Sequence, residues 1–244
     1  MAKLNPVFSG IRVDEGIESA ASIKGVAGKT LLLLAVAVIS AVFSLTSGAT
    51  IIAANPSVLF IVMIGALVCG VLGQVSPNAA KIASVIYAVC EGVMLGLVSL
   101  VFEAAIGGIV LTAVLLTATI FGVMLFLYST EIIKVTGRFV KAMSAIGISI
   151  LIVSVIYLIS YFINPENVLI MALANNTGLL VLVSALVLLY GAFMLVLDFE
   201  QVKSIVNNGF DKKYEWMAAL GLMVTIVWIY IEVLRLLAIF ANRD

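Results

Sequence analysis

The chain has 244 residues, of which 64% are hydrophobic and 11% are charged, and its formal net charge is zero. A soluble domain carries about a quarter charged residues and fewer than half apolar ones, so this chain has too few polar residues to cover a water-soluble fold. A balanced charge with no long run of one sign gives no indication of nucleic-acid binding. The composition therefore predicts an integral membrane protein.

The N-terminal segment is polar and carries charges of both signs, including Lys3, Asp14 and Lys24. A secretory signal would instead show a basic start, a short apolar run and a cleavage site with small residues. The first apolar run begins near Thr30 and has the length of a membrane span. We therefore predict a cytoplasmic arm over residues 1–28 and a transmembrane domain over 29–244.

Seven apolar segments are long enough to be spans, since a helix needs about 20 apolar residues to cross a bilayer. Turn-forming Pro, Asn and Gly residues separate them, and none shows the alternating pattern of a membrane barrel. The predicted fold is therefore all-α, and the narrow third gap predicts a tight antiparallel hairpin. The predicted spans are 29–47, 57–75, 79–103, 107–128, 140–163, 178–200 and 217–240.

The distribution of Lys and Arg predicts the orientation. With the N-terminus in the cytoplasm, 11 of the 13 basic residues lie in the arm, in inner loops or at the inner ends of spans, and the outer loops contain none. Of the remaining two, Arg235 lies in the last span and Arg243 in the tail after it. By the positive-inside rule this bias favours a cytoplasmic N-terminus and an outer C-terminus, with a last helix that re-enters without crossing as the main alternative.

Several kinds of chemistry are not expected. The chain has no His, which removes the commonest metal ligand and the commonest acid–base group. Cys69 and Cys90 lie inside apolar stretches at a spacing that fits neither a zinc site nor a redox pair, so we interpret them as small buried side chains. No phosphate-binding loop is present, and the spans contain neither a Ser–His nor a paired-Asp protease arrangement. Neither an enzyme nor a cofactor is expected.

Four ionisable residues lie inside spans, where a charge is costly unless it is paired or faces water. They are Glu91, Asp198, Glu232 and Arg235. Glu91 fits either an ion path or a protonated acid that hydrogen-bonds a neighbouring helix. Asp198, near the end of its span, fits a solvated boundary residue when taken alone. Glu232 and Arg235 are three residues apart on one helical face, which fits an internal ion pair or a carboxylate that faces another helix.

Three groups of residues resemble the Bax inhibitor family of membrane proteins, in its bacterial branch. They lie in order on the third, sixth and seventh spans: Tyr87 with Glu91-Gly92 and Gly96, then Leu197-Asp198-Phe199-Glu200-Gln201-Val202, and then Trp228-Ile229-Tyr230-Ile231-Glu232. The resemblance implies two three-helix layers around a central C-terminal helix, and a pH-sensitive calcium leak across a bacterial inner membrane. It also implies that Asp198 and Glu232 form an acidic pair that senses protons and gates the leak.

The resemblance leaves one geometric condition open. If the chain turns at residues 207–209, Asp198 lies about 10 residues before the turn and Glu232 about 23 after it, a mismatch near 20 Å along straight helices. Contact between them would require residues 203–218 to be largely loop or surface helix. Close carboxylates titrate as a unit, and calcium prefers oxygen ligands, so the hypothesis has both acids hold the ion weakly. Glu91 would be the next ligand.

Two other functions remain open at this point. The chain could be a membrane regulator that binds other membrane proteins or a membrane-bound protease, with the acids serving only helix packing. It could also be a proton-coupled transporter for a small solute.

Overall fold

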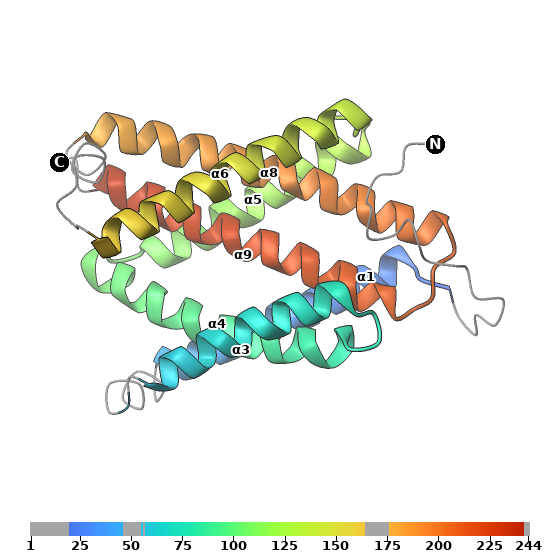
Figure 1. The fold of residues 1–244 in the computed structure, drawn as a ribbon, viewed down its shortest axis with the longest axis horizontal. Coiled ribbons are helices and arrows are strands. Elements are labelled where there is room, and N and C mark those ends of the chain that lie inside the picture. Colours follow the sequence, from blue (N-terminus) through green and yellow to red (C-terminus); the bar gives the residue numbers. More distant parts are fainter. Residues whose placement is uncertain (1–19, 46–54, 56, 164–175, 242–244) are drawn as a thin grey trace. The chain divides into compact units, whose positions relative to one another are not determined.

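The computed structural model describes residues 20–45, 55, 57–163 and 176–241. Within this part of the chain, seven helices are long and apolar enough to cross a bilayer, and the protein is an all-α integral membrane protein (Figure 1). This confirms the predicted fold class and the seven predicted spans. The helices are α1 (Ile23–Phe43), α3 (Ser57–Val75), α4 (Ala80–Ala105), α5 (Ile109–Ser129), α6 (Gly137–Ile163), α8 (Thr177–Asn207) and α9 (Tyr214–Ala241).

The first helix begins earlier than the apolar pattern predicts. Ser22 is the N-cap of α1, and its hydroxyl accepts a hydrogen bond from the Gly25 N–H at 3.0 Å. Residues 23–28 are therefore helical, although they were predicted to belong to the arm; residues 1–19 of that arm lie outside the described residues. The two lysines near this end lower its hydropathy without preventing helix formation, since Lys is a good helix former.

The end of α8 is set by Gly209. This glycine has a φ of +65°, which lets the chain leave the helix in a left-handed conformation. The Gly209 N–H donates to Val206 O at 3.1 Å and the Phe210 N–H donates to Ile205 O at 3.2 Å, which is the Schellman pattern. The helix therefore runs seven residues beyond its predicted end, and the turn to α9 occupies residues 208–213.

A short turn connects α4 to α5 between Ala105 and Ile109, and the predicted packing of the two helices as an antiparallel hairpin stays a prediction. The carboxylate of Glu103 accepts hydrogen bonds from the Gly108 N–H at 2.6 Å and the Val110 N–H at 3.0 Å. These amides have no partner within α5 because they lie at its N-terminal end. Glu103 thus caps the following helix.

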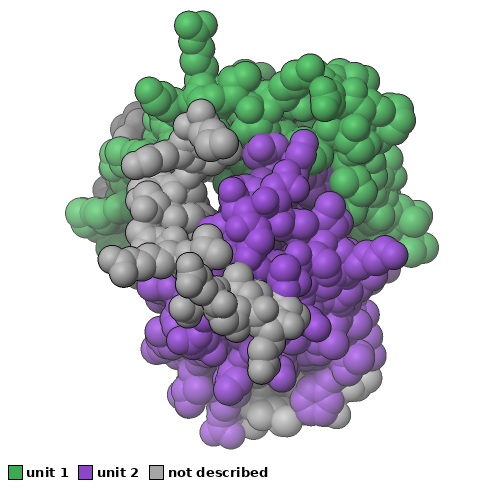
Figure 2. All heavy atoms as spheres, turned by 90° about the vertical axis from the view of Figure 1, so that its right-hand side faces the viewer, with its two compact units in different colours: residues 1–4, 111–197, 228–244 green, residues 5–110, 198–227 purple. Residues whose placement is uncertain are grey.

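The chain divides into two compact units, coloured separately in Figure 2. Unit 1 contains residues 1–4, 111–197 and 228–244, and unit 2 contains residues 5–110 and 198–227. The predicted arrangement of two three-helix layers involves helices of both units, and it stays a prediction.

In unit 2, α1 and α3 both pack on α4. Small residues allow α1 to come close: a Cβ atom on Gly92 would lie 2.8 Å from the Cα of Ala37, and one on Gly96 would lie 2.9 Å from the Cα of Ala41. Neither position has room for a larger side chain. Such small-residue seams are typical of helix pairs in membranes, where close van der Waals packing replaces the hydrophobic effect.

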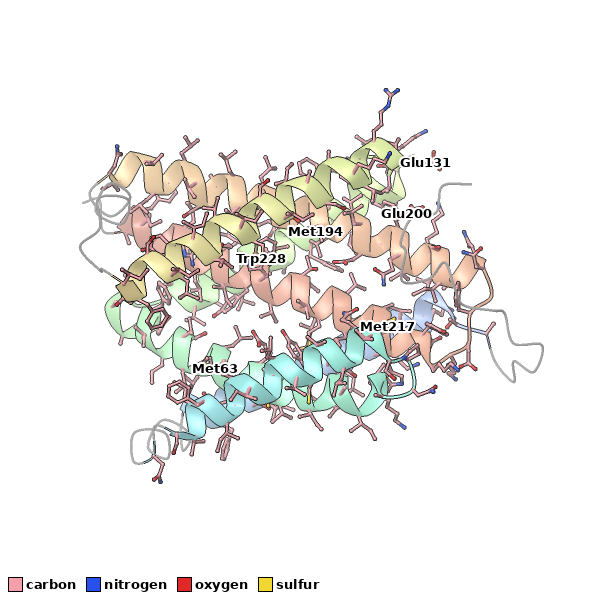
Figure 3. All side chains as sticks on the ribbon, in the orientation of Figure 1. Met63, Glu131, Met194, Glu200, Met217 and Trp228 are labelled. Carbon is pink, nitrogen blue, oxygen red and sulfur yellow. The ribbon has the colours of Figure 1, made fainter. Side chains whose placement is uncertain are left out.

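In unit 1, aromatic side chains join three helices. The rings of Tyr190 on α8 and Trp228 on α9 meet edge to face with centroids 5.6 Å apart, and those of Phe139 on α6 and Phe193 on α8 do so at 5.9 Å. Offset and edge-to-face pairs are the favoured geometries for aromatic rings. Trp228 is labelled in Figure 3.

The last helix is the most buried of the seven. In its most apolar window 44% of the residues are buried, compared with 28% in α8. Met217, labelled in Figure 3, is 1% exposed, and Leu220 and Met223 are fully buried. The central position of this helix, which the family resemblance implies, stays a prediction.

Candidate functional site

A polar group surrounds Asp198 inside unit 2. The side-chain hydroxyl of Thr225 on α9 donates to the Gly221 carbonyl oxygen at 3.3 Å, and it is also placed to donate to the Asp198 carboxyl. A hydroxyl has one hydrogen, so Thr225 serves one of these acceptors at a time. A Cβ atom on Gly221 would lie 4.0 Å from Asp198 Oδ1 and 3.4 Å from Gln74 Nε2, which places the amide of α3 beside the same spot. Three helices therefore meet at the acid.

One oxygen of Asp198 has no protein partner. Its Oδ2 is buried, and among the described residues no donor reaches it. Buried polar atoms are nearly always hydrogen-bonded, so an orphan carboxyl oxygen inside a membrane protein needs an explanation. A proton or a cation bound to this oxygen would satisfy it. Asp198 is therefore not the solvated boundary residue that its position in the sequence allows.

Glu91 makes its hydrogen bond within its own helix. The Tyr87 hydroxyl, one turn earlier on α4, donates to the Glu91 carboxyl. The Tyr87 ring packs against α3, where a Cβ atom on Gly70 would lie 3.2 Å from the ring carbons. Both interpretations of Glu91 from the sequence, an ion path and a packing contact, stay predictions.

Glu232 forms the internal ion pair that the sequence allows. Arg235 Nη1 lies 3.3 Å from Glu232 Oε1, and the side chains are 57% and 6% exposed, respectively. The guanidinium reaches outward while the carboxylate stays buried in unit 1. This acid therefore already has a compensating cation.

The chain between Asp198 and Glu232 is mostly helical. Residues 203–207 belong to α8 and residues 214–218 belong to α9, so this stretch is neither largely loop nor a separate surface helix. Asp198 lies about nine residues before the end of α8 and Thr225 about eleven after the start of α9, which matches their contact at 1.5 Å per residue. Asp198 belongs to unit 2 and Glu232 to unit 1, so their contact stays a prediction.

Glu215 is a buried acid that sequence reasoning missed. It lies in the first turn of α9 and is 0% exposed, although its place at a span end predicts a solvated side chain. Its carboxylate forms an ion pair with Lys29 of α1 and accepts a 2.8 Å hydrogen bond from the Ser22 N–H. A partner 186 residues away leaves no signal in the local pattern.

The described residues contain no group of three or more His, Cys, Asp or Glu side chains that could hold a metal ion. Calcium sites of high affinity use six to eight oxygen ligands with several carboxylates. The geometry around Asp198 thus offers a single carboxylate with neutral oxygen neighbours. Such a set suits transient contact with a cation.

Comparison with known proteins identifies the family of this chain. The family model described as Bax inhibitor 1 like matches residues 5–242, which is nearly the whole chain. No curated protein and no solved structure matches. With seven apolar helices and a family match of this extent, the chain belongs to the Bax inhibitor 1 like family.

Proposed function

We propose that this protein is a proton-sensitive calcium leak in which the Asp198 carboxyl is the titrating group. The observation that carries the proposal is the buried Oδ2 of Asp198, which has no donor among the described residues. Family membership supports a membrane function of this kind, because the resemblance in the sequence implies a calcium leak.

The proposed mechanism follows from the chemistry of the site. When Asp198 carries a proton, the group is neutral, and its neighbours Thr225 and Gln74 are neutral too. Loss of the proton leaves a negative charge, which attracts a cation that accepts oxygen ligands. One carboxylate with neutral oxygens binds calcium weakly, and conduction requires binding that is weak enough for release. Calcium flux should therefore rise as the pH increases.

The other acids have secondary roles in this proposal. Glu91, whose partner is the neutral Tyr87 hydroxyl, is a further carboxylate for the path. Glu232 is held by Arg235, so it contributes to the pH response only when that ion pair loosens. We keep both as candidate calcium ligands.

The orientation and location are part of the proposal. The basic residues favour a cytoplasmic N-terminus, and the resemblance to the bacterial branch favours the inner membrane of a bacterium. In that setting the calcium gradient drives ions toward the cytoplasm whenever the leak is open.

Conduction is tested with purified protein in liposomes that contain a calcium-sensitive dye. Protein-containing vesicles should take up calcium faster than empty ones, at a rate proportional to the amount of protein, and faster at pH 8 than at pH 6. If vesicles that contain folded protein are no leakier than empty vesicles, the leak is refuted. A regulator that binds other membrane proteins then becomes the better interpretation.

A further inference from the structure

A polar cluster joins the first and last helices of unit 2 near their N-terminal ends. Glu215 accepts hydrogen bonds from the Ser22 N–H at 2.8 Å and the Ser22 hydroxyl at 3.2 Å, and it pairs with Lys29. The Lys29 ammonium also lies 5.2 Å from the centroid of the Trp216 ring. Both charged side chains are largely withdrawn from solvent, at 15% exposure for Lys29 and 1% for Glu215.

Backbone contacts continue this junction into the turn between α8 and α9. The Ala21 N–H donates to Phe210 O at 2.8 Å, and Ala20 pairs with Asp211 in an antiparallel bridge. At Gly25 the fit is so close that a Cβ atom would collide with the Glu215 carboxylate. The chain that precedes α1 is thus tied directly to the segment that leads into α9.

The ion pair at this junction is better suited to fixing one arrangement of the helices than to adding stability. A buried ion pair adds little net stability, because the cost of desolvating two charges offsets their attraction, and such pairs are best known for fixing one arrangement of helices. Here the fixed element is the start of α9. The same helix carries Gly221 and Thr225, which close around Asp198 two to three turns later.

Access to the Oδ2 atom of Asp198 requires movement of this region. This oxygen is buried in the present arrangement, so a cation reaches it only after α8, α9 or α3 shifts within unit 2. Breaking the junction at Ser22, Lys29 and Glu215 would free the start of α9 to make that shift.

We propose that Ser22, Lys29 and Glu215 form a releasable clamp that holds the start of α9 against α1 and keeps the leak closed. The closing role rests on the proposed function, whereas release of the clamp can be measured without any flux. In the closed state the clamp excludes ions from Asp198, and in the open state it is broken.

A reversible cross-link tests the closing role. Ala20→Cys and Asp211→Cys, in a protein that also carries Cys69→Ala and Cys90→Ala, place two thiols across an antiparallel bridge, where the Cα atoms lie within disulfide range. Oxidation with copper phenanthroline should reduce calcium uptake at pH 8 at least tenfold, and dithiothreitol should restore it. Fully cross-linked protein that conducts as fast as the reduced protein would overturn the closing role.

Hydrogen exchange tests release of the clamp independently of conduction. Lys29→Met removes the cation while keeping the length of the side chain, so the Ala21 and Ser22 amides should exchange at least tenfold faster than in the wild type. Lys29→Arg keeps the charge, so in this variant the same two amides should exchange at the wild-type rate. Lys134→Met is the matched control, because its ion pair with Glu131 is exposed, at 68% and 69%.

The two experiments separate the possible failures. Unchanged exchange in Lys29→Met would refute a releasable clamp, whatever the flux. If the wild type does not leak at all, the proposed function fails, and the exchange rates alone decide whether Ser22, Lys29 and Glu215 open and close.

Discussion

Glu91, Asp198, Glu215 and Glu232 differ in the kind of partner that they have. Glu215 and Glu232 face cations, whereas among the described residues Asp198 and Glu91 form no ion pair and lie beside hydroxyls. A carboxylate beside a cation is already compensated, and a carboxylate beside a hydroxyl is not. Asp198 and Glu91 are therefore the positions where a proton or a calcium ion changes the local charge most.

At Glu232, the two ways of breaking its ion pair should have unequal effects on stability. Arg235→Met leaves a carboxylate that is 6% exposed without its cation, and should lower the free energy of unfolding by about 1–3 kcal/mol. Glu232→Gln leaves only an exposed guanidinium without a partner, and should cost less than about 1 kcal/mol. Thermal unfolding in detergent measures both. Equal losses of stability in the two variants would show that the Glu232 carboxylate is not buried beside Arg235.

At the scale of residues, the sequence identifies the polar positions better than their partners. An acid in an apolar segment is visible in the pattern, so Glu91, Asp198 and Glu232 could all be found. Their partners were predictable only where they lie one turn away on the same helix, as Arg235 and Tyr87 do. The pairing of Lys29 with Glu215 and of Asp198 with Thr225 depends on how distant helices pack, which the local pattern does not encode.

At the scale of elements, the seam between α1 and α4 depends on glycine. Gly92→Ala would place a Cβ atom 2.8 Å from the Cα of Ala37, so the helices must separate or bend. We expect a loss of about 1–3 kcal/mol, the usual cost of overpacking, visible as a lower unfolding temperature in detergent.

The control for this seam is another glycine of the same helix pair. A Cβ atom on Gly28 of α1 would have no other atom within 4 Å, so Gly28→Ala should leave the unfolding temperature unchanged or slightly higher. If Gly92→Ala behaves in the same way as Gly28→Ala, the close approach of α1 and α4 is contradicted.

Helix ends were predicted correctly where turn-forming residues separate the helices. The Ser76–Asn78 segment ends α3 at Val75, as expected for a chain that meets Pro77. Other ends were predicted too short, because apolar patterns stop at the first charges while the backbone stays helical. The beginning of α1 at Ile23 and the extension of α8 to Asn207 are both of this kind, although Ser22 and Gly209 mark the true ends.

For the whole molecule, the orientation in the membrane is the property that remains to be measured. Gly107→Cys and Gly137→Cys suit this purpose, because both glycines are exposed and have open space around them. In a background of Cys69→Ala and Cys90→Ala, a membrane-impermeant maleimide should label the first in intact cells and the second only after permeabilisation. The reverse pattern would place the N-terminus outside.

Seven spans and the fold class were predictable from the sequence because apolar length alone decides them. The arrangement of the helices was implied only by the family resemblance, and the division into two units has no counterpart in the apolar pattern. The proposed leak is best tested at Asp198, its proposed titrating group.

The most direct test measures calcium uptake into liposomes between pH 6 and pH 8 for the wild type and for Asp198→Asn, with Glu131→Gln as a control for loss of an exposed acid. Wild-type uptake and that of Glu131→Gln should rise with pH, since deprotonation of Asp198 creates the charge that attracts calcium. Asp198→Asn, which cannot ionise, should stay low and independent of pH. If Asp198→Asn is well folded and keeps the wild-type pH response, Asp198 is not the proton sensor and the account is contradicted.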